Sequence, residues 1–187
     1  MPNLITLVRI LIVPFFFSTL LYYHPEKDSL RLWAFGLFLA GSVTDAMDGL
    51  VARLGKKTSK LGRFLDPLAD KLLLLSGYLG LLLAKDFPLL PPLWITVAIV
   101  FRDVVILGGL TLFFISGAPV HVRPNLLGKV TTGFQMATLL SVLLLLPVSP
   151  WLWNLTALLT IASGLTYVVR EMRRLRHSSR KNTCNSY

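Results

Sequence analysis

Four aspartates at regular spacing are the residues of this sequence best suited to chemistry: Asp45, Asp48, Asp66 and Asp70. Asp45 and Asp48 are three positions apart and Asp66 and Asp70 are four apart, so on helices each pair shares one face. If the two faces meet, four carboxylates converge, and their mutual repulsion requires cations between them. Because no His or Cys lies nearby, these hard oxygen ligands predict Mg²⁺ or Mn²⁺, as a pair of divalent ions.

Small residues and an arginine separate the two acidic pairs. Gly49 and Ala52 lie on or beside the face that carries the first pair, which leaves room for a ligand against the helix backbone. Arg53 suits phosphate oxygens, and Gly62 follows nine positions later. The alternatives are close helix packing for the small residues and a cytoplasmic anchor for Arg53. Together the residues indicate a polyphosphorylated ligand bridged by metal ions, and phosphoryl transfer at a membrane surface.

Two other interpretations of the acids stay open. In the first, the aspartates only stabilise solvated helix ends and pair with Arg53 or Arg63. In the second, they form a cation or proton pathway, so that the protein is an ion transporter. The acids bunch at one membrane face and do not form a ladder across the bilayer, which disfavours transport.

The composition predicts an integral membrane protein. The chain has 187 residues, of which 54% are hydrophobic and 15% charged, and its mean hydropathy is +0.67. We expect an all-α fold with six transmembrane helices, a single membrane domain at 1–175 and a basic cytoplasmic tail at 176–187. The expected spans lie near 4–23, 30–53, 65–85, 92–116, 125–147 and 150–172.

The distribution of cations predicts the orientation. The net charge of the chain is +10. Thirteen Lys and Arg residues flank the expected spans on one side of the membrane and three on the other. Both termini and the aspartates are therefore expected on the cytoplasmic side of the cell's inner (cytoplasmic) membrane. Because the cations lie between apolar blocks, no nucleic-acid partner is expected. The first apolar run lacks a cleavage pattern and is expected to stay as a helix, and the single Cys184 excludes an intramolecular disulfide.

The complete pattern resembles the signature of the CDP-alcohol phosphatidyltransferase family. It runs Asp45-x2-Asp48-Gly49-x2-Ala52-Arg53-x8-Gly62-x3-Asp66-x3-Asp70, with eight fixed residues over 26 positions. The opening Pro2-Asn3-Leu4-Ile5-Thr6 with Arg9 and Pro14, and the later Gly128-Lys129-Val130-Thr131-Thr132 with Gln135-Met136, are similar to the bacterial phosphatidylglycerophosphate synthase and cardiolipin synthase branches of this family.

The resemblance implies a fold and a set of roles. It implies six transmembrane helices around a cytoplasm-facing polar cavity, usually in a homodimer, with CDP-linked lipid and two divalent ions bound in the cavity. The implied metal ligands are Asp45, Asp48, Asp66 and Asp70, with Asp70 as the base that takes the proton from the acceptor hydroxyl. The implied CDP-lipid-binding residues are Asp48, Gly49, Ala52, Arg53 and Gly62, with Gly62 allowing the backbone to turn.

The acceptor alcohol is the less constrained part of the prediction. Arg102, beside Asp103 in the expected fourth helix, and Lys129, early in the fifth, would suit an acceptor phosphate. Alternatively, Arg102 neutralises Asp103 or the aspartates, and Lys129 extends to the cytoplasmic interface. The resemblance implies transfer of phosphatidyl from CDP-diacylglycerol to glycerol 3-phosphate, giving phosphatidylglycerophosphate and CMP.

Other acceptors and one other enzyme class are alternatives to this prediction. The pair Arg102-Asp103 also resembles cardiolipin synthases of the family, which would make phosphatidylglycerol the acceptor. Inositol phosphate and serine are less favoured. A membrane prenyltransferase would also use aspartates and Mg²⁺, but its Asn-Asp-x2-Asp-x3-Asp pattern is not found in the sequence.

Overall fold

The computed structural model is all-helical in the residues that it describes, which are 2–54, 60–84, 86–115 and 126–184. Side chains are described for 6–44, 68–84, 86–109, 111 and 126–166. A short 3-10 helix, η1, spans Pro25–Lys27. The six α-helices are α1 (Pro2–Leu21), α2 (Ser29–Leu54), α3 (Lys60–Leu83), α4 (Leu93–Ile115), α5 (Leu126–Leu143) and α6 (Ser149–Cys184).

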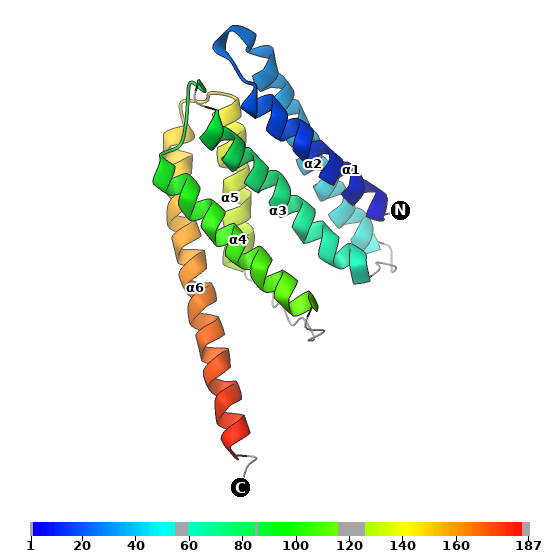
Figure 1. The fold of residues 1–187 in the computed structure, drawn as a ribbon, viewed down its shortest axis with the longest axis vertical. Coiled ribbons are helices and arrows are strands. Elements are labelled where there is room, and N and C mark those ends of the chain that lie inside the picture. The colour runs from blue at the N-terminus through cyan, green and yellow to red at the C-terminus, as the bar shows by residue number, and fades with distance from the viewer. Residues whose placement is uncertain (1, 55–59, 85, 116–125, 185–187) are drawn as a thin grey trace.

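The helices form two groups that lie side by side (Figure 1). In the first group, α1 packs along both α2 and α3. In the second group, α6 packs along both α5 and α4. Helix α3 contacts α4 and α5, and α2 contacts α5, so these contacts join the groups. Successive helices alternate in direction, which brings both termini toward the same end of the bundle (Figure 1).

Glycines on α3 allow this helix to approach its neighbours closely. A Cβ atom added at Gly77 would overlap Leu139 Cδ2 on α5 and would lie 3.2 Å from Phe16 Cε1 on α1. A Cβ atom added at Gly80 would lie 2.7 Å from Leu20 Cδ1. Phe16, Leu20 and Leu139 are fully buried members of one apolar core. Small residues at such crossings are the usual means by which membrane helices gain packing contact.

An arginine ties the two groups together at the end remote from the termini. Arg31 Nε and Nη2 each donate a hydrogen bond of 2.7 Å to the carboxylate oxygens of Asp28. Arg31 Nη1 donates to the Leu143 carbonyl oxygen at 2.9 Å. Leu143 is the last residue of α5, whose terminal carbonyls have no partner within the helix. Arg31 therefore links the start of α2 to the end of α5.

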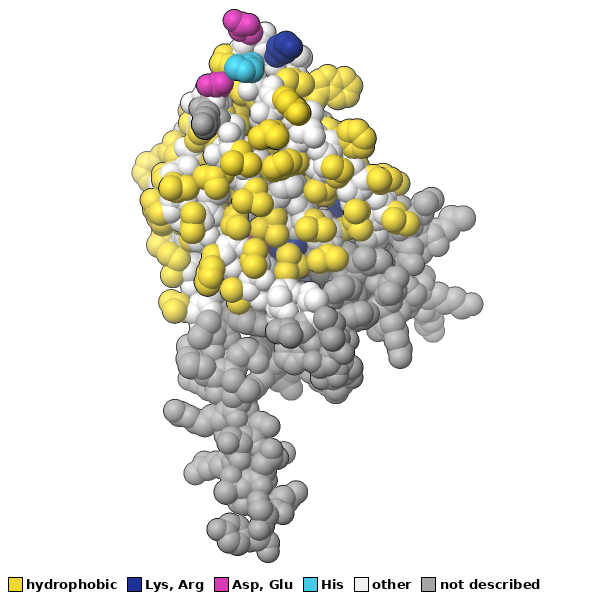
Figure 2. Space-filling view, in the orientation of Figure 1, with side chains coloured by type: hydrophobic (Ala, Val, Ile, Leu, Met, Phe, Trp, Pro, Cys, Tyr) yellow, Lys and Arg dark blue, Asp and Glu magenta, His cyan; other side chains and the backbone are white. Residues whose placement is uncertain are grey.

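The outer surface is apolar and the interior holds charge, which is the reverse of a soluble protein. Large hydrophobic side chains cover the middle of the visible face in Figure 2, where the acidic side chains, one lysine or arginine and a histidine gather at one tip. Leu11, Phe15 and Phe101 are each more than 60% exposed, whereas Arg9 and Asp103 are fully buried. Such an arrangement suits a bilayer, whose hydrocarbon covers apolar surface without cost.

The part of the chain that the structure describes contains one helix with the length and composition needed to cross a membrane. Among the described residues, Leu126–Leu143 is long and apolar enough, and Thr6–Leu21 and Ser29–Thr44 are shorter apolar stretches.

The sequence-based prediction of six helices agrees with the six observed, and most boundaries differ by only a few residues. Two details of the structure differ from what the sequence suggested. Gly62 was expected to let the chain turn, but it lies inside α3, which already begins at Lys60. A glycine is tolerated in a first helical turn because the N–H groups there need no helical partner. Helix α6 continues to Cys184, well beyond the expected span end near 172.

Candidate active site

The aspartates lie on two helices that meet at the end of the bundle that carries the N-terminus. Asp45 and Asp48 occupy the last third of α2, and Asp66 and Asp70 occupy the first half of α3. Because α2 ends at Leu54 and α3 begins at Lys60, these parts of the two helices lie at the same end (Figure 1). The backbone thus carries both acidic pairs to one region, as the sequence pattern predicts.

Most of the predicted signature lies outside the described side chains. This applies to three of the four predicted metal ligands and to all the small residues and the arginine of the predicted CDP-lipid site. These residues are Asp45, Asp48, Gly49, Ala52, Arg53, Gly62 and Asp66. Asp70 is the exception, with a half-buried side chain on α3. The predicted base is therefore placed, one helical position before a buried lysine.

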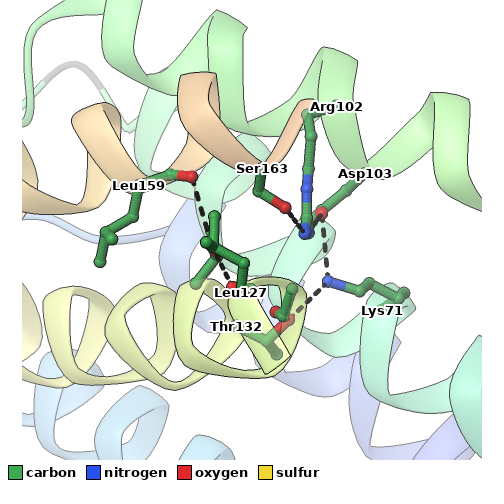
Figure 3. A network of polar contacts seen from close by, with 9 residues as sticks. Lys71, Arg102, Asp103, Leu127, Thr132, Leu159 and Ser163 are labelled. Carbon is green, nitrogen blue, oxygen red and sulfur yellow. Dashed lines mark hydrogen bonds and ion pairs between the residues drawn. The ribbon is translucent and has the colours of Figure 1, made fainter. Parts of the chain in front are cut away.

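A polar network of five side chains lies next to Asp70 and joins four helices (Figure 3). Its members are Lys71, Arg102, Asp103, Thr132 and Ser163. Lys71 Nζ donates to Asp103 Oδ1 and to Thr132 Oγ1, each at 3.1 Å. Arg102 Nη1 donates to the same Asp103 Oδ1 at 2.7 Å, and Arg102 Nη2 donates to Ser163 Oγ at 2.9 Å.

The polar network is buried and carries an excess of positive charge. Lys71, Arg102 and Asp103 are each at most 9% exposed, and the two cations share a single carboxylate. Within the described residues, Asp103 Oδ2 and Arg102 Nε have no hydrogen-bond partner. Buried polar atoms without partners are costly, so such atoms beside an unbalanced positive charge are suited to receive an anionic, hydroxyl-bearing ligand.

Further polar groups extend from the network along α5, where they contact α6 and α3. Thr138 Oγ1 and Thr156 Oγ1 are 2.7 Å apart and hydrogen-bonded. Tyr78 Oη donates to the Gln135 carbonyl oxygen at 3.0 Å. The Gln135 side-chain amide is fully buried and has no partner among the described residues. Hydrogen bonds of this kind hold membrane helices together where apolar contact gives no driving force.

The structure separates the two cations that were predicted to bind the acceptor. Arg102 lies in the polar network, where it contacts Asp103 as the alternative interpretation expected. Lys129 is exposed near the start of α5 and is not a member of the network. Sequence reasoning missed Lys71 and Ser163. The available signal for Lys71 was a charge followed directly by the apolar run Leu72-Leu73-Leu74-Leu75.

The donor set suits a divalent cation. The four aspartates supply only carboxylate oxygens, which Mg²⁺ and Mn²⁺ prefer, and Asp70 is accessible at the edge of the bundle core. Among the described side chains no three acidic, His or Cys residues are placed so that they could hold a metal ion together, and only Asp70 of the four predicted ligands belongs to that set.

The described part of the chain is thus an all-helical bundle with paired aspartates on adjacent helices, next to a buried basic network. The family model for CDP-alcohol phosphatidyltransferases matches residues 1–167. The chain belongs to this family and is a phosphatidyltransferase.

Three relatives of the chain carry names of particular enzymes of this family. The chain is 32% identical over 180 residues to the "Probable phosphatidylglycerophosphate synthase" of Mycobacterium tuberculosis, covering 92% of this chain and 82% of the relative. It is 34% identical over 153 residues to the CDP-diacylglycerol–glycerol-3-phosphate 3-phosphatidyltransferase of Bacillus subtilis, covering 77% and 76%. It is 36% identical over 191 residues to the "Probable cardiolipin synthase (CMP-forming)" of Drosophila melanogaster, covering 90% and 56%.

Proposed function

We propose that this enzyme transfers the phosphatidyl group of CDP-diacylglycerol to glycerol 3-phosphate, with phosphatidylglycerophosphate and CMP as products. The relatives named for this reaction, which match most of the chain, support the proposal. The observation that carries it is the net positive polar network beside Asp70, because glycerol 3-phosphate is a soluble dianion. An anion of this size gains strong charge-assisted hydrogen bonds from buried Lys and Arg side chains.

The proposed mechanism assigns each step to a residue. Asp70 takes the proton from the acceptor hydroxyl, whose oxygen attacks the lipid-side phosphorus in line while CMP leaves. Asp45, Asp48, Asp66 and Asp70 would hold Mg²⁺ or Mn²⁺, which neutralises charge on the diphosphate. Gly49, Ala52 and Arg53 hold the CDP moiety together with Asp48, and Gly62 leaves space at the start of α3.

The acceptor phosphate is assigned to the polar network. Arg102 and Lys71 carry two positive charges against the one negative charge of Asp103. One positive charge therefore remains for the incoming phosphate. Lys129, which is exposed near the start of α5 and three residues before Thr132, would attract the acceptor from the cytoplasm. The hydroxyl that reacts would face Asp70, the proposed base, which precedes Lys71 on α3.

The membrane arrangement is part of the proposal. Six spans with both termini and the site on the cytoplasmic side of the inner membrane agree with the cation distribution, the alternating helix directions and the exposed apolar surface. We also propose a homodimer, as the family resemblance implies. The lipid substrate then enters from the bilayer and glycerol 3-phosphate from the cytoplasm.

A single assay tests the reaction. Purified protein is incubated with CDP-diacylglycerol and Mg²⁺, and CMP release is compared with glycerol 3-phosphate, phosphatidylglycerol, inositol phosphate or serine as acceptor. CMP and a new lipid are expected with glycerol 3-phosphate. A product with phosphatidylglycerol alone would instead establish the second candidate, a cardiolipin synthase, which the Drosophila relative favours. Absence of CMP with every acceptor would refute the proposed reaction and favour the alternative of an ion transporter.

The role of Asp70 has its own test. Asp70→Asn keeps the shape of the side chain but removes the base and a metal ligand, so turnover at saturating Mg²⁺ should fall at least about a hundredfold. Asp86→Asn is the matched control, because Asp86 is exposed at the far end of the bundle, 3.5 Å from His24. Near-normal turnover of Asp70→Asn would remove Asp70 from the role of base.

A further inference from the structure

Lys71 bonds directly to both α4 and α5 from the helix that carries Asp70. Its Nζ donates to Asp103 Oδ1 on α4 and to Thr132 Oγ1 on α5, each at 3.1 Å (Figure 3). Its side chain is buried, so these contacts are shielded from water. The single ammonium group therefore connects the first helix group to two helices of the second.

The partners of Lys71 are themselves held in place. Asp103 Oδ1 also accepts from Arg102, and Arg102 donates to Ser163 on α6. The chain of contacts thus runs from α3 through α4 to α6, with a branch to α5. A buried charged contact of this kind has a defined geometry, because each group would be unsatisfied if the helices shifted.

Lys71 is also the residue that follows Asp70. Consecutive residues of a helix are separated by a rise of about 1.5 Å, so fixing the Lys71 side chain fixes the backbone of Asp70 relative to α4 and α5. The aspartates belong to α2 and α3, whereas Arg102 and Thr132 belong to the second group. The reaction requires a defined distance between the aspartates and these side chains of the second group. Among the described residues, Lys71 is the contact between the two groups that lies nearest to the aspartates.

We propose that Lys71 is a positioning residue that sets the Asp70-bearing helix against the acceptor-binding side chains of α4 to α6. The proposal rests on the proposed function, since it assigns the acceptor to the second helix group. Lys71 acts in this role through Asp103 and Thr132. Its loss misplaces the acceptor hydroxyl relative to Asp70 and leaves the CDP-lipid site on α2 and α3 in place.

The test measures the two substrates separately. In Lys71→Met, kcat should fall and KM for glycerol 3-phosphate should rise, each about tenfold, because small misplacements at a reacting centre are costly. KM for CDP-diacylglycerol should stay within about twofold. Lys71→Arg keeps the charge and the reach, and should recover part of the lost kcat.

Two further variants separate positioning from general stability. Thr132→Val is nearly isosteric and removes the α5 contact of Lys71, together with the bond from Thr132 Oγ1 to the Gly128 carbonyl oxygen within α5. It should shift kcat and the acceptor KM in the same direction as Lys71→Met, by less, at an unchanged Tm. Tyr78→Phe is the matched control, because it removes another α3–α5 hydrogen bond, that from Tyr78 Oη to the Gln135 carbonyl, seven residues further along α3. Its acceptor KM should match that of the unaltered enzyme.

Equal changes in both KM values, or an effect of Tyr78→Phe as large as that of Thr132→Val, would overturn the positioning role. If Lys71→Met does not fold, Thr132→Val and Lys71→Arg decide the question by the same ratio of KM values. The unaltered enzyme reports separately on the proposed function. If it used another acceptor, the reaction would be renamed and the comparison of variants repeated with that acceptor.

Discussion

Asp28 shows how a single exposed side chain can contribute to the fold. Its carboxylate accepts two hydrogen bonds from Arg31, and these bonds hold the pKa of Asp28 below its usual range. Because the pKa is lower in the folded protein than in the unfolded chain, the pair stabilises folding at pH values above the ordinary carboxyl range. That contribution is lost as the pH falls through the folded pKa.

We therefore expect the Tm in detergent to fall as the pH is lowered from 7 to about 3, since carboxylates titrate in this range. Asp28→Asn should have a lower Tm than the unaltered protein at pH 7, and this difference should shrink toward pH 3. Thermal unfolding of both proteins over this range is the measurement. A difference that does not depend on pH would contradict a role for the ionised carboxylate.

Some residues of the site could be predicted from the sequence and others could not. The aspartates were predictable because helical spacing alone places Asp45 with Asp48, and Asp66 with Asp70. Arg102 was predicted, and its contact with Asp103 was one of two alternatives. The role of Lys71 could not be predicted, since its partners Asp103 and Thr132 are 32 and 61 positions away, and only the packing of helices brings them together.

At the scale of the element, the sequence of α3 meets two requirements, the site and the helix packing. One part of the helix carries Asp66, Asp70 and Lys71, and the rest presents Gly77 and Gly80 to α1 and α5. The glycines let α3 pack closely, and close packing brings Lys71 within hydrogen-bond distance of two other helices. The glycine positions are therefore expected to affect activity as well as stability.

Gly77→Val should lower the stability by about 1–3 kcal/mol, since the added atoms meet Leu139 and the ring of Phe16. Gly108→Val on α4 is the matched control, because a Cβ atom there has no neighbour within 4 Å. Thermal unfolding in detergent compares the two variants. Equal losses would mean that the close approach at Gly77 does not limit the packing.

The elements were more predictable than their ends. Runs of apolar residues bounded by Pro and Gly were sufficient to locate six helices. The start of α3 was wrong because Gly62 is a weak helix former whose cost near a helix start is small, and composition alone does not reveal this. The full length of α6 was not predicted, because the expected span at 150–172 covers only its apolar part, and the Arg and Lys residues that follow are good helix formers.

At the scale of the whole molecule, α6 extends beyond the other helices at the end where the termini lie (Figure 1). Its 36 residues correspond to about 54 Å, whereas a bilayer core is about 30 Å thick. The helix thus reaches well past a membrane that surrounds the bundle. Cys184, the only cysteine of the chain, is the last residue of α6.

This position gives a direct test of the proposed orientation. A membrane-impermeant maleimide should leave Cys184 unlabelled in intact cells and label it after the membrane is permeabilised. The control is Glu26→Cys combined with Cys184→Ser, because Glu26 is exposed in η1 at the opposite end and should be labelled in intact cells. Labelling of Cys184 from outside would reverse the proposed topology.

The division of the bundle into two helix groups has a consequence for how this family could diversify. The aspartate signature is confined to α2 and α3, whereas the three network residues that contact Lys71 or Arg102 all lie on α4 to α6. Mutations in the second group would therefore be free to change the alcohol while the first group keeps its hold on the nucleotide. Chimeras that exchange α4 to α6 between phosphatidylglycerophosphate and cardiolipin synthases should follow the acceptor preference of the second group.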